Sequence, residues 1–166
     1  MSAGQVRSAR SALEAERAET LASALRVRSV TASEIAGGGL SLIFVRSSDV
    51  SGVPPRLRAA AGFASPEAAR SGAMAVEGMV RDAIETGQVQ IGKAEVSLGD
   101  RGDGGLWVTP ITFEGRIHGA LAVASAAELS EDAIERLRAL AQFIGLHLDH
   151  YRLVAEVERL EFQARR

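Results

Sequence analysis

Residues 105–125 read GLWVTPITFEGRIHGALAVAS, and this segment gives the firmest structural prediction in the chain. Two apolar, β-rich runs flank the polar turn Glu114-Gly115-Arg116, a pattern that predicts a β-hairpin. Side chains alternate along a strand. The second run therefore has two faces: Ile117, Leu121 and Val123 on one, and His118, Ala120, Ala122 and Ala124 on the other. Because neither face is strongly polar, we expect a sheet covered on both sides, with a helix packed closely on the alanine face.

The composition limits the classes of protein to which the chain can belong. Its 166 residues, of which 46% are hydrophobic, suit one domain with a proper core. A net charge of -2 with both signs interspersed argues against nucleic-acid binding, which needs a basic surface to neutralise phosphates. The absence of cysteine excludes disulfides, a thiolate nucleophile, Cys-ligated zinc and a thioether-linked chromophore. No segment resembles a signal peptide or a membrane span, so we expect a cytoplasmic protein without membrane insertion.

The first part of the chain predicts a helix followed by two strands. Residues 6–30 contain no proline and repeat leucine at roughly helical spacing, which favours a helix. After the glycines at 37–39, the apolar run Leu40–Val45 predicts a buried strand, and residues 56–63 predict its hairpin partner. The residues between them, 47–55, include Asp49, Gly52 and two prolines and have the composition of a turn.

The middle of the chain predicts helices that pack on this sheet. Ser65-Pro66-Glu67 is typical of a helix start, and we expect a short helix that Gly72 interrupts. A second helix over residues 73–86 has one apolar stripe, and Gly87 lies where a left-handed C-terminal cap is wanted. Val89 and Ile91 indicate a brief strand, after which residues 93–105 are expected to form a mobile loop.

The last helix is predicted to begin after Ser130 and to continue to Arg166. Its apolar residues keep spacings of three and four beyond the length that one small domain can cover. We therefore expect a parallel homodimer in which the first and last helices of two chains form a bundle. The candidate interface residues are Leu13, Leu21, Ile144, Leu148, Tyr151, Val154, Val157 and Leu160.

The order of these elements, together with several local sequences, resembles a GAF domain. The sequences that carry the resemblance are LRAAAG at 57–62, GMVRDAIETG at 78–87, WVTPI at 107–111, GALAV at 119–123 and residues 140–151. The resemblance covers residues 24–151, with an N-terminal helical extension over 1–23 and a C-terminal helical, coiled-coil-like extension over 152–166. It implies an α+β fold related to PAS domains: an antiparallel sheet of about six strands, with terminal helices on one face. Short helices and loops would enclose a pocket on the other face.

The resemblance does not fix a ligand, because known GAF domains bind cyclic nucleotides, tetrapyrroles, haem, iron, amino acids or nothing. The residues that we expect at a small-molecule pocket are Phe44, Met74, Met79, Trp107, Thr109, Ile111 and His118. Apolar walls with few polar groups are typical of binding sites. The same residues also suit a filled core, which we favour, since a small domain must bury its only tryptophan. In either case we expect Trp107 in the layer opposite the terminal helices.

The sequence predicts no catalytic, metal or cofactor site. His118, His147 and His150 lack an evident third ligand, and Asp100 and Asp103 among glycines are too few for a calcium loop. Family members that reduce methionine sulfoxide, or hold bilins covalently, use cysteines that this chain lacks. We therefore expect a non-enzymatic signalling or regulatory module that senses a small molecule or transmits a signal through its terminal helices to a partner protein or output domain. The alternatives are a dimerisation or scaffolding domain with a vestigial, ligand-free pocket and, third, a haem- or metal-binding sensor.

Overall fold

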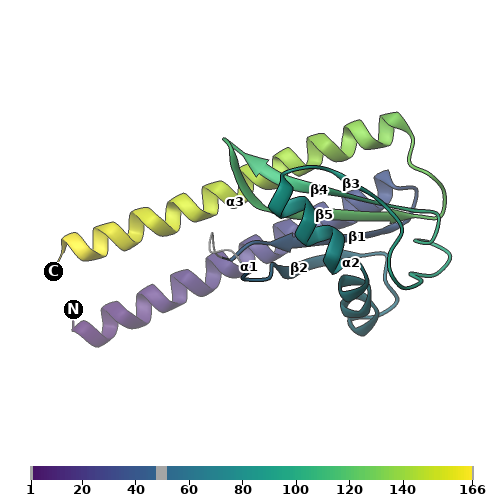
Figure 1. Ribbon diagram of the computed structural model, residues 1–166. Coiled ribbons are helices and arrows are strands. Elements are labelled where there is room, and N and C mark those ends of the chain that lie inside the picture. The colour runs from purple at the N-terminus through teal and green to yellow at the C-terminus, as the bar shows by residue number, and fades with distance from the viewer. Residues whose placement is uncertain (1, 48–51, 166) are drawn as a thin grey trace.

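The computed structural model describes residues 2–47 and 52–165, and it is organised around one antiparallel sheet between helical layers (Figure 1). In chain order the elements are α1 (Ala3–Ile35), β1 (Leu40–Val45), β2 (Arg56–Ala61), α2 (Pro66–Thr86), β3 (Gln90–Gly92), β4 (Gly105–Phe113), β5 (Arg116–Ser125) and α3 (Glu131–Ala164). The predicted α+β fold is confirmed. The middle of the turn expected over 47–55, residues 48–51 with Asp49, lies outside the described residues, as does Arg166.

The sheet has five strands among the described residues, in the order β2-β1-β5-β4-β3, where about six were expected. Every neighbouring pair is antiparallel, and β5 is central because it pairs with both β1 and β4. The turn between β4 and β5 has positive φ at Glu114 (48°) and Gly115 (76°), which matches the twist that a two-residue hairpin requires. The predicted hairpin over residues 105–125 is therefore confirmed.

Two helices, α1 and α2, are longer than the sequence suggested. α1 extends beyond the predicted 6–30 at both ends, and α2 is a single helix that runs through Gly72. A Cβ atom at Gly72 would lie 2.6 Å from the Phe63 ring, so the glycine allows close packing and does not interrupt the helix. Both predicted ends of α2 are confirmed. Ser65 accepts the Ala68 amide as N-cap, and Gly87 is left-handed at a φ of 67°.

Each face of the sheet carries its own apolar core. On one face, α1 and α3 cover Ile43, Trp107, Ile111, Leu121 and Val123. On the other face, α2 covers a set that includes three alanines of β5, Ala120, Ala122 and Ala124. The predicted close approach of a helix to the alanine face is thus confirmed.

The terminal helices lie side by side and run in opposite directions, so both chain ends are at the same end of the molecule (Figure 1). Their outer parts extend past the sheet in the direction of the two termini. A buried contact fixes α1 to the sheet: the Ser41 hydroxyl donates to the Ser29 carbonyl at 2.6 Å. Within the described chain, no helix combines the length and apolarity that a membrane span requires.

The loop before β4, expected to be mobile, contains a defined turn. The Asp103 carboxylate accepts hydrogen bonds from the Ser97 hydroxyl at 2.5 Å and from the Leu98 amide at 2.6 Å. These bonds favour the ionised form and lower the pKa of Asp103 below its usual range, the Ser97 bond most strongly. Asp103 therefore has a structural role in closing this turn.

Candidate functional site

The α2 face of the sheet, where a ligand pocket was expected, is occupied by side chains. Phe44 is buried there and Met79 packs against it, whereas Met74 is 75% exposed on the outer side of α2. The residues of α2 that fill the space over the sheet are Val76, Val80 and Ala83. The prediction that Met74 lines a pocket is therefore wrong. The described residues on this face form a filled core, which is the alternative that we favoured.

The remaining pocket candidates lie on the opposite face. Trp107 is 3% exposed and packs with Ile111 in the core beneath α1 and α3. Thr109, which is buried, falls between them on the same face by strand alternation. The expectation that Trp107 lies opposite the terminal helices is wrong. The seven candidates do not converge, because the alternation of β4 turns its large side chains toward α1 and α3.

His118 lies on the face opposite to the one that simple alternation predicts, because β5 contains a β-bulge. Ile111 pairs with Gly119 and Thr112 pairs with Ile117, so His118 is an extra residue in β5. Strict alternation would have placed His118 with the alanines. Instead its imidazole points under α3, where Nε2 lies 3.3 Å from Oδ1 of Asp149. A bulge depends on the register between strands, so the β5 sequence alone does not show it.

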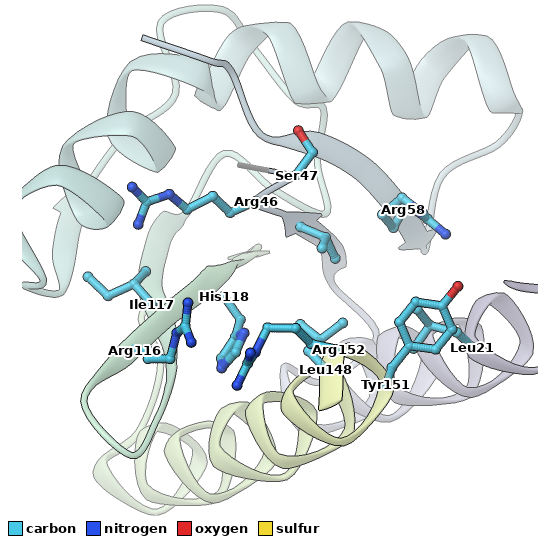
Figure 2. A pocket seen from close by; sticks show the side chains of 11 residues that line it. Leu21, Arg46, Ser47, Arg58, Arg116, Ile117, His118, Leu148, Tyr151 and Arg152 are labelled. Atoms are coloured by element: carbon cyan, nitrogen blue, oxygen red, sulfur yellow. The ribbon is translucent and has the colours of Figure 1, made fainter. Parts of the chain in front are cut away.

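A pocket of about 330 Å³ opens beside His118, between the sheet and the terminal helices (Figure 2). We call it the basic pocket, because four arginines from four separate segments line it. Its described lining is Leu21, Val45, Arg46, Ser47, Arg58, Arg116, Ile117, His118, Leu148, Tyr151 and Arg152. No acidic residue belongs to this lining. No sequence pattern predicts this pocket, because its arginines are far apart in the chain.

A buried carboxylate lies behind the arginine wall. Asp149 of α3 is 7% exposed and accepts a hydrogen bond from Arg152 at 3.3 Å, while His118 approaches the same oxygen. One carboxylate thus interacts with two cationic or potentially cationic groups. The Nε atom of Arg152 is buried and has no hydrogen-bond partner among the described residues. The arrangement holds the Arg152 side chain at the pocket while leaving one of its donors unused.

The expected dimer residues divide into two groups. Leu21, Ile144 and Leu148 are buried against the sheet of their own chain, so assigning them to an interface between chains is wrong. Tyr151 and Val154 are half-buried near α1. The exposed members are Leu13, Val157 and Leu160.

α3 carries a second apolar stripe that the sequence analysis did not separate from the buried one. Its members are Phe143, Leu146, His150, Leu153, Val157 and Leu160. Their spacing alternates between three and four residues, as in the a and d positions of a heptad. All six are exposed, and Val157, for example, is 53% exposed. α1 adds Val6, Leu13 and Val27, which are also exposed and recur at intervals of seven and fourteen.

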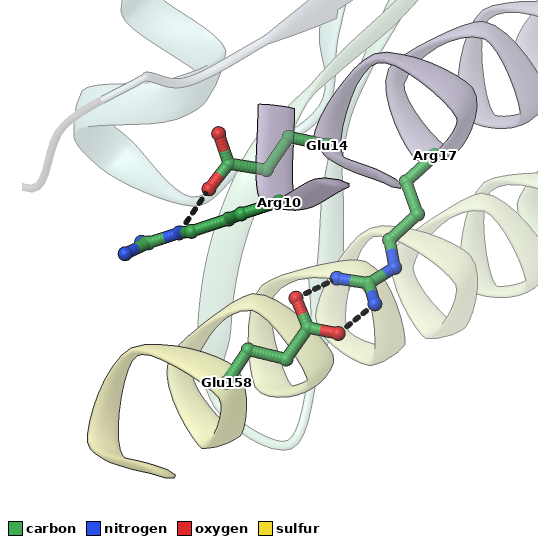
Figure 3. A network of polar contacts seen from close by, with 4 residues as sticks. All are labelled: Arg10, Glu14, Arg17 and Glu158. Carbon is green, nitrogen blue, oxygen red and sulfur yellow. Dashed lines mark hydrogen bonds and ion pairs between the residues drawn. The ribbon is translucent and has the colours of Figure 1, made fainter. Parts of the chain in front are cut away.

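Polar and cation–π contacts join the two terminal helices, both beside the sheet and beyond it. Figure 3 shows the Arg17 guanidinium of α1 facing the Glu158 carboxylate of α3 in an ion pair. Farther along, the Arg10 guanidinium lies 4.7 Å from the centre of the Phe162 ring. Near the sheet, Arg28 lies 5.2 Å from the centre of the Phe143 ring. The helices are therefore connected along their length, and they present a common outer surface.

No metal centre is formed by the described residues: three His, Cys, Asp or Glu side chains never gather as metal ligands would. His147 and His150 instead line a shallow groove between α1 and α3, together with Leu13 and Val154. This groove is continuous with the exposed stripe, because His150 belongs to both.

The GAF domain sequence pattern matches residues 14–149, whereas no curated protein matches the chain. The GAF domain of a phosphoenolpyruvate-protein phosphotransferase from Acinetobacter has a TM-score of 0.63 at 17% identity, over 93% of this chain and 98% of that one. The second GAF domain of DevS from Mycobacterium smegmatis has a TM-score of 0.57 at 15% identity, over 84% and 99%.

A type II free methionine-R-sulfoxide reductase from Thermoplasma acidophilum is also similar, with a TM-score of 0.61 at 12% identity, over 81% of this chain and 96% of that one. At such identities the structural likeness establishes the fold alone. The sequence match spans most of the chain, and the observed sheet and helix layers agree with it. The protein therefore belongs to the GAF domain family.

Proposed function

We propose that this GAF domain is a non-enzymatic regulatory module that works as a homodimer and transmits its state through α1 and α3. The observation that carries the proposal is the exposed stripe of α3, which alternates in steps of three and four over the outer surface of the helix pair. Such a stripe is the pattern of a helix that packs against another helix. The stripe lies on α3, which extends past the sheet together with α1. These helices therefore join the core of the domain to the partner that they contact.

A symmetric pair of chains would cover this stripe. Two helices from each chain would form a four-helix arrangement in which Leu153, Val157 and Leu160 become buried. Each such side chain contributes about 1.5–3 kcal/mol when fully removed from water. We favour a parallel pair, with the two-fold axis along the helices. The termini of both chains then emerge at the same end of the dimer.

The non-enzymatic part of the proposal is supported by the residues available. The sequence has no cysteine, so thiol chemistry is not open to it despite the fold that it shares with a reductase. His118 and Asp149 form a pair, yet α3 and the sheet hold both groups largely buried.

The filled α2 face favours a second candidate, a dimerisation domain that binds no ligand. The two candidates share the helix pairing and differ in whether a small molecule changes it. They are distinguished by the ligand experiments described below.

Disulfide trapping tests the parallel arrangement. Val157→Cys introduces the only cysteine, and in a parallel pair the two sulfurs meet near the symmetry axis. We expect rapid intermolecular crosslinking under mild oxidation. Ala155→Cys is the matched control, since Ala155 is exposed on the same turn but points away from the stripe. Equal crosslinking of both variants, or of neither, would contradict the parallel seam.

A further inference from the structure

The basic pocket has the charge of an anion-binding site. Arg46, Arg58, Arg116 and Arg152 bring four guanidinium groups to a cavity of about 330 Å³, and its described lining contains no carboxylate. The nearest buried acid, Asp149, lies behind Arg152 and neutralises one charge at most. Arg46 and Arg116 have interactions of their own, so Arg58 and Arg152 supply the positive charge that a ligand would meet. The ligand that complements such a cavity is an anion.

Two of the arginines have donors available. Arg58 is exposed and makes no ion pair among the described residues, and the Arg152 side chain is 39% exposed. The Arg152 guanidinium can therefore donate to a ligand oxygen as well as to Asp149.

Cationic and apolar side chains both line the cavity. In Figure 2, Arg116, His118 and Arg152 gather near the β4–β5 hairpin, and Arg58 lies across from them near Tyr151. Leu21, Leu148 and Val45 supply the apolar wall. A ligand that contacts both kinds of side chain needs an anionic group attached to a small apolar body.

We propose that the basic pocket binds a small organic anion, a carboxylate or phosphate monoester with an apolar body, through Arg152 and Arg58. This site lies on the terminal-helix face of the sheet and not beneath α2. It includes Leu21 of α1 and Leu148, Tyr151 and Arg152 of α3, so an occupant contacts both helices of the pair. The binding does not depend on the homodimer, because every lining residue belongs to one chain.

Titration calorimetry with four probes tests the chemistry of the ligand. Phenyl phosphate and benzoate carry the anionic group on an aromatic ring, benzyl alcohol lacks the charge, and inorganic phosphate lacks the apolar body. We expect phenyl phosphate or benzoate to bind with a Kd of about 1 mM or lower, and their ranking shows which anion is preferred. Benzyl alcohol and inorganic phosphate should bind at least about tenfold more weakly, since each lacks one of the two contacts.

Substitution of the arginines tests the location. Arg58→Gln with Arg152→Gln should weaken the better probe by about tenfold or more, because charge-assisted hydrogen bonds to the anion are lost. Arg138→Gln removes the same charge from an exposed position on α3 outside the pocket and should change the Kd less than twofold. An independent readout is the NMR resonance of the Arg152 Nε–H group, which should shift when the probe is added to the unsubstituted protein.

Three results would overturn the proposal: no binding of phenyl phosphate or benzoate at 10 mM, equal affinity for benzyl alcohol, or an Arg152 Nε–H resonance that does not respond. Unchanged affinity in the double variant would do the same. Light scattering on the same samples reports the oligomeric state separately. A failure of ligand binding therefore leaves the homodimer proposal standing, and the loss of the dimer leaves the binding result standing.

Discussion

Gly145 provides a sharp test of how α3 is fixed to the sheet. It lies in the middle of α3, and a Cβ atom placed on it would lie 2.6 Å from the carbonyl oxygen of Thr112 in β4. Ordinary contact begins near 3.4 Å, so Gly145→Ala requires α3 and β4 to separate by about 0.8 Å, the difference between the two distances. Because the obstacle is backbone, this strain cannot be relieved by rotating a side chain. Overpacking of this kind costs about 1–3 kcal/mol.

Gly78→Ala in α2 is the matched control. A Cβ atom there meets only the end of the flexible Glu95 side chain, at 3.4 Å. Both substitutions gain up to about 1 kcal/mol of helix propensity, so this gain cancels when the two variants are compared. Gly145→Ala should therefore be less stable than Gly78→Ala by about 1–3 kcal/mol, or about 2–12 °C in Tm for a domain of this size.

Thermal unfolding followed by circular dichroism, at one fixed protein concentration, measures this difference. The fixed concentration matters because association stabilises the folded state by mass action. If Gly145→Ala proved as stable as Gly78→Ala, the close approach of α3 to β4 would be refuted, and with it the geometry of the basic pocket.

Three further results are expected. Trp107 should emit at a blue-shifted wavelength and resist acrylamide, because it is 3% exposed; a water-like spectrum would contradict its place in the core. Leu137→Ala should destabilise the protein by about 2–5 kcal/mol, while Met74→Ala, at an exposed site, should change the stability by less than about 0.5 kcal/mol. Similar losses of stability in the two variants would refute the buried position of Leu137 and the exposed position of Met74. As pH falls through the lowered pKa of Asp103, the carboxylate is protonated and its bond to the Leu98 amide weakens. The NMR shift of that amide should titrate with a midpoint below 3.8, and a midpoint at or above 3.8 would count against the turn.

Local chemistry made part of the fold predictable from the sequence. The β4–β5 turn, the Ser65 cap and the Gly87 cap depend on conformations or hydrogen bonds that a few neighbouring residues determine. The alanine face of β5 predicted a closely packed helix for the same reason, since three small side chains lie at alternate positions.

The face assignment of β4 was not predictable, because both faces of the sheet are apolar. Alternation groups Trp107 with Ile111, but it does not say which helices cover that group. The bulge at His118 then reverses the alternation at the start of β5, so Ile117 lies near Gly87 at the end of α2 and not with Leu121 and Val123 as expected. The bulge depends on the register between β4 and β5. These two features together separated the expected pocket residues.

The candidate site and the interface depend on tertiary structure. Arg46, Arg58, Arg116 and Arg152 meet only when β1, β2, β5 and α3 are assembled. On α3, the buried and exposed stripes have similar spacing, so a sequence pattern combines them into one. Only the packing of α3 against the sheet shows which stripe is left for a partner.

Multi-angle light scattering at tens of micromolar chain tests the central claim most directly. We expect the unsubstituted chain to have twice its own mass of 17.5 kDa, because the exposed stripe of α3 is covered by a second copy. Leu153→Glu with Val157→Glu places two charges in this stripe and should give the monomer mass, with the circular dichroism spectrum unchanged. A 17.5 kDa species for the unsubstituted chain would contradict the account, as would a double variant that remains dimeric.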